Sequence, residues 1–203
     1  MQDYPKSLRP EAKVGFTVTD VWAAYSPVKN SPADAKAKAD TGNPSHSATS
    51  GELDIYVANC RTLSKLGAHV AAPVDVVFNG LALQLPPQVV FLPSFALTFS
   101  HIKARFRNPA AVSLTARSTL VLDGDIVVEG LQLDGALIVR AGPGARVVLR
   151  GLVVRNAGYE WRALTGDAFA AAPEEERVRG FHVQRNEARE IVVTGPGETI
   201  ISS

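Results

Sequence analysis

The chain has 203 residues, of which 46% are hydrophobic and 20% are charged, as in an ordinary globular protein. Its 21 Lys and Arg residues nearly balance 20 Asp and Glu residues, so a net charge of +1 creates no broad field to hold nucleic acid or an anionic membrane. The single cysteine, Cys60, excludes an intramolecular disulfide and a cysteine zinc cluster, and we expect a buried thiol there.

Targeting signals are the next feature to consider. The segment MQDYPKSLRPEAK has no apolar run after its basic residues and is not typical of a secretory signal. The most apolar stretch, Leu81 to Leu97, is interrupted by three prolines and is unsuited to a membrane helix of about 20 residues. We therefore predict a cytoplasmic protein with no membrane partner and no nucleic acid partner.

The first predicted element is a strand over Val14 to Tyr25, which is rich in β-branched and aromatic residues. With no partner strand nearby in the sequence, we expect it to be poorly held. Pro27 favours an extended Ser26, which places Lys29 at the end of this strand. By itself, a lysine in this place is most simply a solvent-facing residue.

A polar loop and a helix follow. Residues 30–47 are rich in Ser, Pro, Asn and Gly, and a loop of this length is usually functional or disordered. Thr49 and Glu52 have capping-box spacing, apolar residues recur at helical intervals, and Gly67 ends the run, so we predict a helix there. His46 precedes the helix N-terminus, where an anion is favoured, although a plain surface histidine is the alternative.

The middle of the chain predicts β-structure. Asn79-Gly80 between two aliphatic runs indicates a hairpin, whereas residues 89–102 fit either a helix or a strand. From Val112 onward, short β-branched runs are separated by glycines. Such runs favour either a parallel β-helix, in which they stack on one another, or a β-sandwich.

The rest of the chain contains a short charged run and two Gly-Pro-Gly segments. Glu174, Glu175 and Glu176 are more typical of a solvated face or a helix start than of a metal site, and a strand is predicted over Val178 to Val183. Residues 185–203 are expected to form a final strand or cap. Two segments, Gly142-Pro143-Gly144 and Gly195-Pro196-Gly197, lack the residues of a phosphate-binding loop, so we predict turns there. The spacing of the other three histidines, His69, His101 and His182, is not that of metal ligands.

Several blocks carry a resemblance to one enzyme family. DYPKSLRPEAKVGFTVTDVWAAYSPVKN, GNPSHSATSGELDIYVAN, LQLDGALIV and RGFHVQ resemble, in this order, blocks of the plant and protist UDP-sugar pyrophosphorylases. The resemblance covers nearly the whole chain but only the C-terminal part of the family's proteins. It implies a mixed, mainly β fold, in which the truncated edge of a Rossmann-like nucleotidyltransferase core precedes a parallel β-helix that is left-handed in the relatives.

The resemblance also implies domain boundaries and a chemistry. Residues 1–67 correspond to a nucleotidyltransferase segment, 68–111 to a connection and 112–203 to the β-helix domain. Such enzymes transfer a uridylyl group from UTP to a sugar 1-phosphate and release pyrophosphate, so the implied partners are UTP, sugar 1-phosphates, UDP-sugars and pyrophosphate. Catalysis of this kind depends on positioning and on neutralising phosphate charge, a task that a well-supported lysine performs.

The resemblance assigns roles to individual residues. Lys29 of the PVKN block matches the family lysine that contacts the nucleotide-sugar phosphates, and Asn30 and His46 are candidate substrate contacts. The glycine-rich nucleotide loop and the carboxylates for Mg²⁺ have no counterpart here. Mg²⁺ would therefore be bound mainly by the part of the family's chain that is missing, and this chain alone is expected to be inactive.

Two other classes of protein are possible on the sequence. A non-catalytic β-helix module that presents its faces to a partner is the first, although a partnerless apolar strand at its start argues against independence. A hexapeptide-type acyltransferase is the second, but its regular aliphatic repeat is absent.

Overall fold

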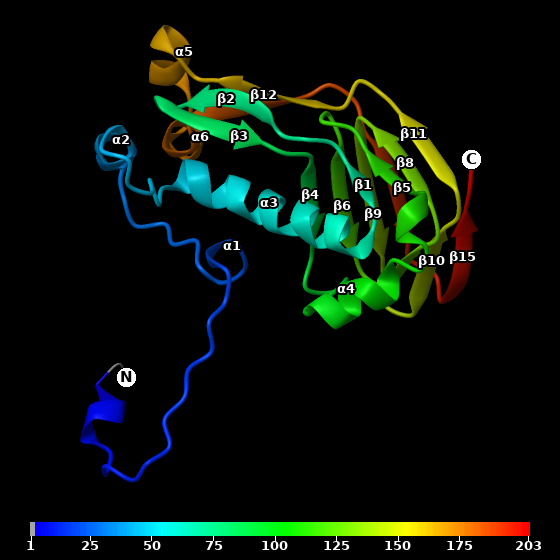
Figure 1. Cartoon of the computed structure of the whole chain (residues 1–203). Coiled ribbons are helices and arrows are strands. Elements are labelled where there is room, and N and C mark those ends of the chain that lie inside the picture. The colour runs from blue at the N-terminus through cyan, green and yellow to red at the C-terminus, as the bar shows by residue number, and fades with distance from the viewer. Residues whose placement is uncertain (1–2) are drawn as a thin grey trace.

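The computed structural model describes residues 3–203 and contains mixed α and β structure with many parallel strands, as predicted (Figure 1). Its helices are η1 (Tyr4–Ser7), α1 (Val21–Ala24), α2 (Pro32–Asp40), α3 (Ala48–Leu66), α4 (Phe99–Arg105), η2 (Pro109–Ala111), α5 (Gly166–Ala171) and α6 (Glu174–Arg179). None of these helices in residues 3–203 is both long enough and apolar enough to cross a membrane.

Fifteen strands complete the described chain. Those before the long β region are β1 (His69–Val70), β2 (Val74–Phe78), β3 (Leu81–Leu85) and β4 (Gln88–Phe91). They are followed by β5 (Val112–Leu114), β6 (Thr119–Asp123), β7 (Ile126–Val128), β8 (Leu131–Asp134), β9 (Ala136–Ala141), β10 (Ala145–Leu149), β11 (Leu152–Arg155), β12 (Tyr159–Ala163), β13 (Phe181–Arg185), β14 (Arg189–Val193) and β15 (Gly197–Ile201).

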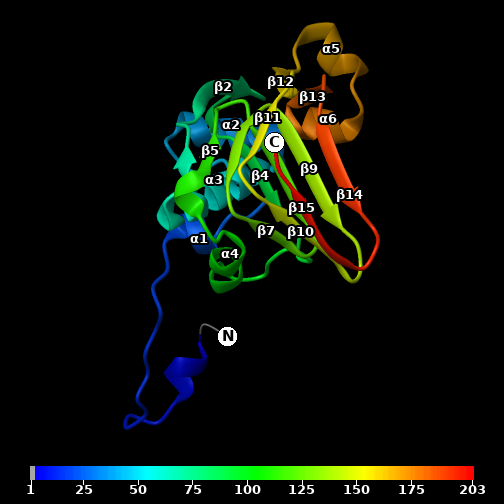
Figure 2. The same cartoon turned by 90° about the vertical axis from the view of Figure 1, so that its right-hand side faces the viewer.

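Three parallel sheets hold most of these strands. Their orders are β1-β5-β8-β11, β14-β9-β6-β4 and β15-β10-β7, and the chain visits the three sheets in turn as it passes through β5, β6 and β7 and then β8, β9 and β10 (Figure 2). Neighbouring strands in each sheet run in the same direction, so the antiparallel β-sandwich alternative is wrong. We call these three sheets the stack.

In-register apolar side chains form the core of the stack. Val112, Leu131 and Leu152 are aligned on three successive strands, and each is at most 1% exposed. Leu120 and Leu137 form a second aligned pair and are fully buried. Each short run buries its apolar side chains against its neighbours, which is the stacking that the glycine-divided sequence predicts.

Helix α3 packs along the stack and joins its core. Leu63 and Cys60 belong to the same buried cluster as the stack residues, which confirms the predicted burial of Cys60. The predicted helix and its end are correct, since Gly67 adopts φ +101° as the C-cap. The predicted N-terminal box is wrong, however, because Ser47 is the N-cap and pairs with Ser50.

The N-terminal third corrects two further expectations. The predicted strand over Val14 to Tyr25 is wrong: residues 12–20 have no regular structure, and Val21–Ala24 is a helical turn. No described strand pairs with this segment, so its backbone has no ladder to join. The predicted loop over residues 30–47 instead contains α2, in which Ser31 caps the helix and Pro32 occupies the first turn.

The hairpin and the undecided region are settled by the structure. Strands β2 and β3 pair antiparallel around Asn79 and Gly80, both at positive φ, as the hairpin signal predicts. The undecided residues 89–102 contain most of β4 and the first turn of α4. The three glutamates begin helix α6, and the strand predicted from Val178 starts only at Phe181 because Gly180 ends the helix at φ +83°.

Residues 156–188 leave the stack after β11 and return to it at β14, and we call this segment the excursion. Its antiparallel ribbon β12–β13 packs on α3 and on the β2–β3 hairpin through a second buried cluster that includes Leu53, Phe78 and Phe181. Residues 185–203 contain β14 and β15, and both Gly-Pro-Gly segments connect consecutive strands, as predicted.

Candidate functional site

The fold brings Lys29, Asn30 and His46 together. The backbone N–H groups of Lys29 and Asn30 both donate to the His46 carbonyl oxygen, at 2.9 and 3.1 Å. The Asn30 side chain also donates to the Ser45 carbonyl oxygen at 2.7 Å. Three residues predicted from two separate blocks of sequence therefore occupy one cluster. Lys29 lies between α1 and α2, however, and not at the end of a strand as expected.

Helix α2 explains this proximity. It begins at Pro32, two residues after Asn30, and the chain returns through Gly42 at φ +75° to reach Ser47, the N-cap of α3. His46 lies at φ +46°, a left-handed conformation that is uncommon for residues other than glycine. The two hydrogen bonds to its carbonyl oxygen hold this conformation in place.

Two further residues complete the cluster. The Lys29 Nζ lies 3.3 Å from the Tyr25 hydroxyl oxygen, and the Tyr25 ring meets the His46 ring edge-on at 5.7 Å between centroids. The Lys38 Nζ donates to the Asn30 side-chain oxygen at 3.0 Å. Sequence reasoning missed Tyr25 and Lys38, because Lys38 approaches Asn30 only once α2 has formed.

The electrostatics of this cluster suit an anion. Within residues 3–203, neither Lys29 nor Lys38 forms an ion pair with a carboxylate, whereas nearby Lys36 pairs with Asp40 at 2.8 Å. Lys29 is exposed, so its ammonium group is open to a ligand. The Lys29 ammonium group near Tyr25 and the Lys38 ammonium group at Asn30 can each donate hydrogen bonds to phosphate oxygens.

A metal site is a separate question. Within the described residues, no group of three or more His, Cys, Asp and Glu side chains comes together to hold an ion. His182 instead pairs with Glu176 at 2.8 Å. The described side chains therefore offer no preformed cluster of ligands for a magnesium ion.

Comparisons with known proteins identify the relatives of the chain. No family model matches it. Over 193 residues it is 46% identical to a UDP-sugar pyrophosphorylase of Oryza sativa subsp. indica, a match that covers 94% of this chain and 30% of the relative. The chain is related to the UDP-sugar pyrophosphorylases. A UDP-sugar pyrophosphorylase of Arabidopsis thaliana is 44% identical over 199 residues, which is 98% of this chain and 32% of the relative.

The chain is much shorter than these relatives, and this limits which predictions the comparison can test. The similarity to UDP-sugar pyrophosphorylases is confirmed across nearly all of its residues, but the chain spans only about a third of the curated relatives that it matches. The predicted domain boundaries, the C-terminal position within the family and the roles of Lys29, Asn30 and His46 stay predictions.

Proposed function

We propose that this chain forms the C-terminal part of a UDP-sugar pyrophosphorylase and supplies a phosphate-binding lysine to its active site. The reaction is the reversible transfer of a uridylyl group from UTP to a sugar 1-phosphate, which yields a UDP-sugar and pyrophosphate. The observation that carries the proposal is the convergence of Lys29, Asn30 and His46, in a chain that is 44–46% identical to enzymes of that name.

In this proposal Lys29 contacts the phosphates. A sugar phosphate oxygen attacks the α-phosphorus of UTP while pyrophosphate leaves from the opposite side, so charge on the phosphate oxygens must be neutralised. The Lys29 backbone is held by its bond to the His46 carbonyl oxygen, and its exposed ammonium group, 3.3 Å from the Tyr25 hydroxyl oxygen, provides a compact charge for this purpose. Asn30 and the His46 ring contact the substrate beside it.

The remaining parts of the proposal concern fold and location. In this proposal the stack is a parallel β-helix, left-handed as the family resemblance implies, and residues 1–67 form one edge of a Rossmann-like nucleotidyltransferase core. Mg²⁺ is bound mainly by residues outside this chain, and the enzyme is cytoplasmic. The chain alone is inactive, because the nucleotide-binding loop is not among its residues.

The test of Lys29 requires a protein that extends this chain upstream to the length of its relatives. Lys29→Ala is expected to lower kcat about 10²- to 10³-fold, as the loss of one preorganised donor to a transition-state charge does. The matched control is Lys103→Ala, at an exposed position of α4. Turnover of Lys29→Ala within twofold of this control would overturn the assignment.

His46 can be tested without disturbing its backbone. His46→Asn keeps a residue that tolerates positive φ and keeps the carbonyl that receives Lys29 and Asn30, while it removes the imidazole ring. The loss of one substrate hydrogen bond is expected to raise KM about 2- to 10-fold with kcat nearly unchanged. An unchanged KM would remove His46 from the substrate contacts.

A further inference from the structure

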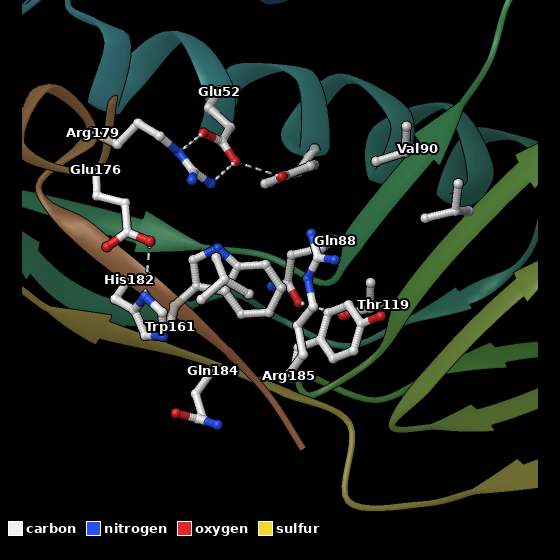
Figure 3. Close-up of a pocket in the computed structure, with 14 residues that line it drawn as sticks. Glu52, Gln88, Val90, Thr119, Trp161, Glu176, Arg179, His182, Gln184 and Arg185 are labelled. Atoms are coloured by element: carbon white, nitrogen blue, oxygen red, sulfur yellow. Dashed lines mark hydrogen bonds and ion pairs between the residues drawn. The ribbon is translucent and has the colours of Figure 1, made fainter. Parts of the chain in front are cut away.

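A cavity of about 660 Å³ lies between α3, the β4–β6 pair and the ribbon β12–β13 (Figure 3). Its volume is within the roughly 300–1,000 Å³ that small-molecule sites occupy. None of Lys29, Asn30 and His46 lines it. It is therefore a different place from the cluster proposed above to bind phosphate.

One wall of this cavity is held by a partly buried polar network. Glu52 on α3 accepts two hydrogen bonds from the Arg179 guanidinium, both at 2.7 Å, and a third from the Tyr56 hydroxyl at 2.8 Å. These hydrogen bonds from Arg179 to Glu52 raise the pKa of Arg179, and burial together with the Glu52 charge raises the pKa of Tyr56. The wall is thus preformed and carries no net charge.

The opposite wall has unused donors. The indole Nε1–H of Trp161 is buried and has no acceptor among the described residues, a situation that costs about 1–3 kcal/mol. Arg185 lies over the Tyr159 ring, 5.8 Å from its centroid, and forms no ion pair within residues 3–203. Both Trp161 and Arg185 line the cavity, but protein atoms cover the Trp161 Nε1, so a ligand that enters meets the indole ring and the N–H groups of the exposed Arg185 guanidinium.

The charges around the cavity restrict the ligand. Glu52 is balanced by Arg179 and Glu176 is hydrogen-bonded to His182, which leaves Arg185 as the one cation lining the cavity without a carboxylate partner in the described chain. A polyphosphate needs several such cations and does not fit. A ligand with one anionic group matches this balance.

The aromatic residues restrict the ligand further. Tyr159 and Trp161 are two positions apart on β12, with ring centroids 6.5 Å apart, and they offer flat apolar faces beside the donors. The aliphatic part of the lining consists of Val90, Val121 and Val183, too little for a lipid. A pyranose ring combines a C–H face that packs on aromatic rings with a rim of hydroxyl groups that accept and donate hydrogen bonds.

We propose that this cavity binds a single hexose ring with one anionic substituent, the ring packing on Tyr159 and Trp161 and the anion meeting Arg185. This site goes beyond the proposed uridylyl transfer, which uses the Lys29 cluster. The anionic group is either a carboxylate or a phosphate ester, and the probes below separate the two.

The two tryptophans of the chain make the test direct. In a Trp22→Phe background Trp161 is the only tryptophan, and its emission is titrated with glucuronate, glucose 6-phosphate and glucose. We expect a saturable change with a dissociation constant of about 1 mM for an anionic sugar, typical of a small ligand with few contacts. Glucose should bind up to about fivefold more weakly, because an exposed arginine contributes modestly. The anionic sugar that binds more tightly identifies the carboxylate or the phosphate.

Matched variants decide whether the cavity is responsible. Arg185→Gln should lower the affinity for the anionic sugar to that for glucose, whereas Arg189→Gln, an exposed arginine on β14, should not. Lys29→Ala should also leave binding unchanged, which separates this site from the proposed catalytic cluster. Calorimetry on the unsubstituted chain checks that the Trp22 substitution has no effect.

Three results would overturn the proposal. The first is the absence of saturable binding of every sugar up to 50 times the expected constant, about 50 mM. The second is binding that Arg185→Gln leaves unchanged or that Lys29→Ala abolishes. The third is binding of acetate or inorganic phosphate as tight as that of the anionic sugars, which would reveal an anion site with no preference for a ring.

Discussion

The N-terminal segment and the stack contain similar apolar residues in opposite surroundings. In the segment of residues 3–20, Phe16 is 90% exposed and Val18 is 81% exposed, and Figure 1 shows this part of the chain extending away from the body. In the stack, Leu120 and Leu137 are fully buried. The difference is in the partners: each strand of the stack lies beside another strand, whereas no described strand pairs with the segment. A β-prone sequence needs a neighbour before it buries anything.

The largest contrast is expected from side-chain truncation. Leu137→Ala leaves a cavity in the stack and should lower the free energy of unfolding by about 2–5 kcal/mol. Phe16→Ala removes a larger side chain that is already in water, so it should change this free energy by less than about 0.5 kcal/mol. Urea titrations of both variants measure the difference. Equal losses would mean that Phe16 is buried in solution.

A smaller contrast is expected from two glycines. Gly124 has φ +99°, and a Cβ there would lie 2.1 Å from the Ala141 carbonyl oxygen, so Gly124→Ala should destabilise the stack by about 1–3 kcal/mol. At Gly15 a Cβ meets nothing within 4 Å, and Gly15→Ala should leave the urea midpoint unchanged. A midpoint for Gly124→Ala equal to that of the parent chain would show that the turn at Gly124 is not held as described.

The smallest expected difference between the stack and the N-terminal segment concerns how stability changes at acidic pH. Burial raises the pKa of Asp125, but hydrogen bonds from Arg146 and Arg105 outweigh it and hold the pKa below its usual 3.8. A lowered folded-state pKa contributes stability above pH 3.8 that is lost as pH falls through the lower value. Asp125→Asn should therefore cost about 0.2–1 kcal/mol at pH 7 and flatten the fall in stability below about pH 4.

The control for this acid effect lies in the N-terminal segment. Asp3 and its partner Lys6 are about four-fifths exposed, and Asp3→Asn should leave the acid profile unchanged. Thermal unfolding from pH 7 to pH 3 measures both variants. The same profile for Asp125→Asn and the parent chain would contradict the role of the Asp125 ion pairs.

Local signals in the sequence predicted much of the fold. Asn79-Gly80 specified the hairpin because few other residues accept positive φ at both turn positions, and Gly67 marked the end of α3 for the same reason. Ser31 followed by Pro32 is a helix-start signal for α2. The Ser, Pro, Asn and Gly content of residues 30–47 outweighed this signal and predicted a loop instead. The strand expected over Val14 to Tyr25 failed because no strand among residues 3–203 pairs with it.

Contacts between residues far apart in the sequence could not be predicted from local sequence patterns. The clustering of Lys29 with His46 depends on how α2 turns the chain back, and only the family resemblance pointed to both residues. The cavity between α3 and the ribbon β12–β13 could not be predicted from the sequence. Glu52 and Arg179 are 127 positions apart, and neither has a local pattern that indicates the other.

The most direct test of the central claim compares this chain with one that is extended upstream to the length of its relatives. The measurement is pyrophosphate-dependent release of UTP from UDP-glucose and UDP-galactose. Activity of the longer protein alone is the predicted result, because Lys29 then acts beside a nucleotide-binding domain. Activity of neither, with the longer protein shown to be folded, would contradict the account.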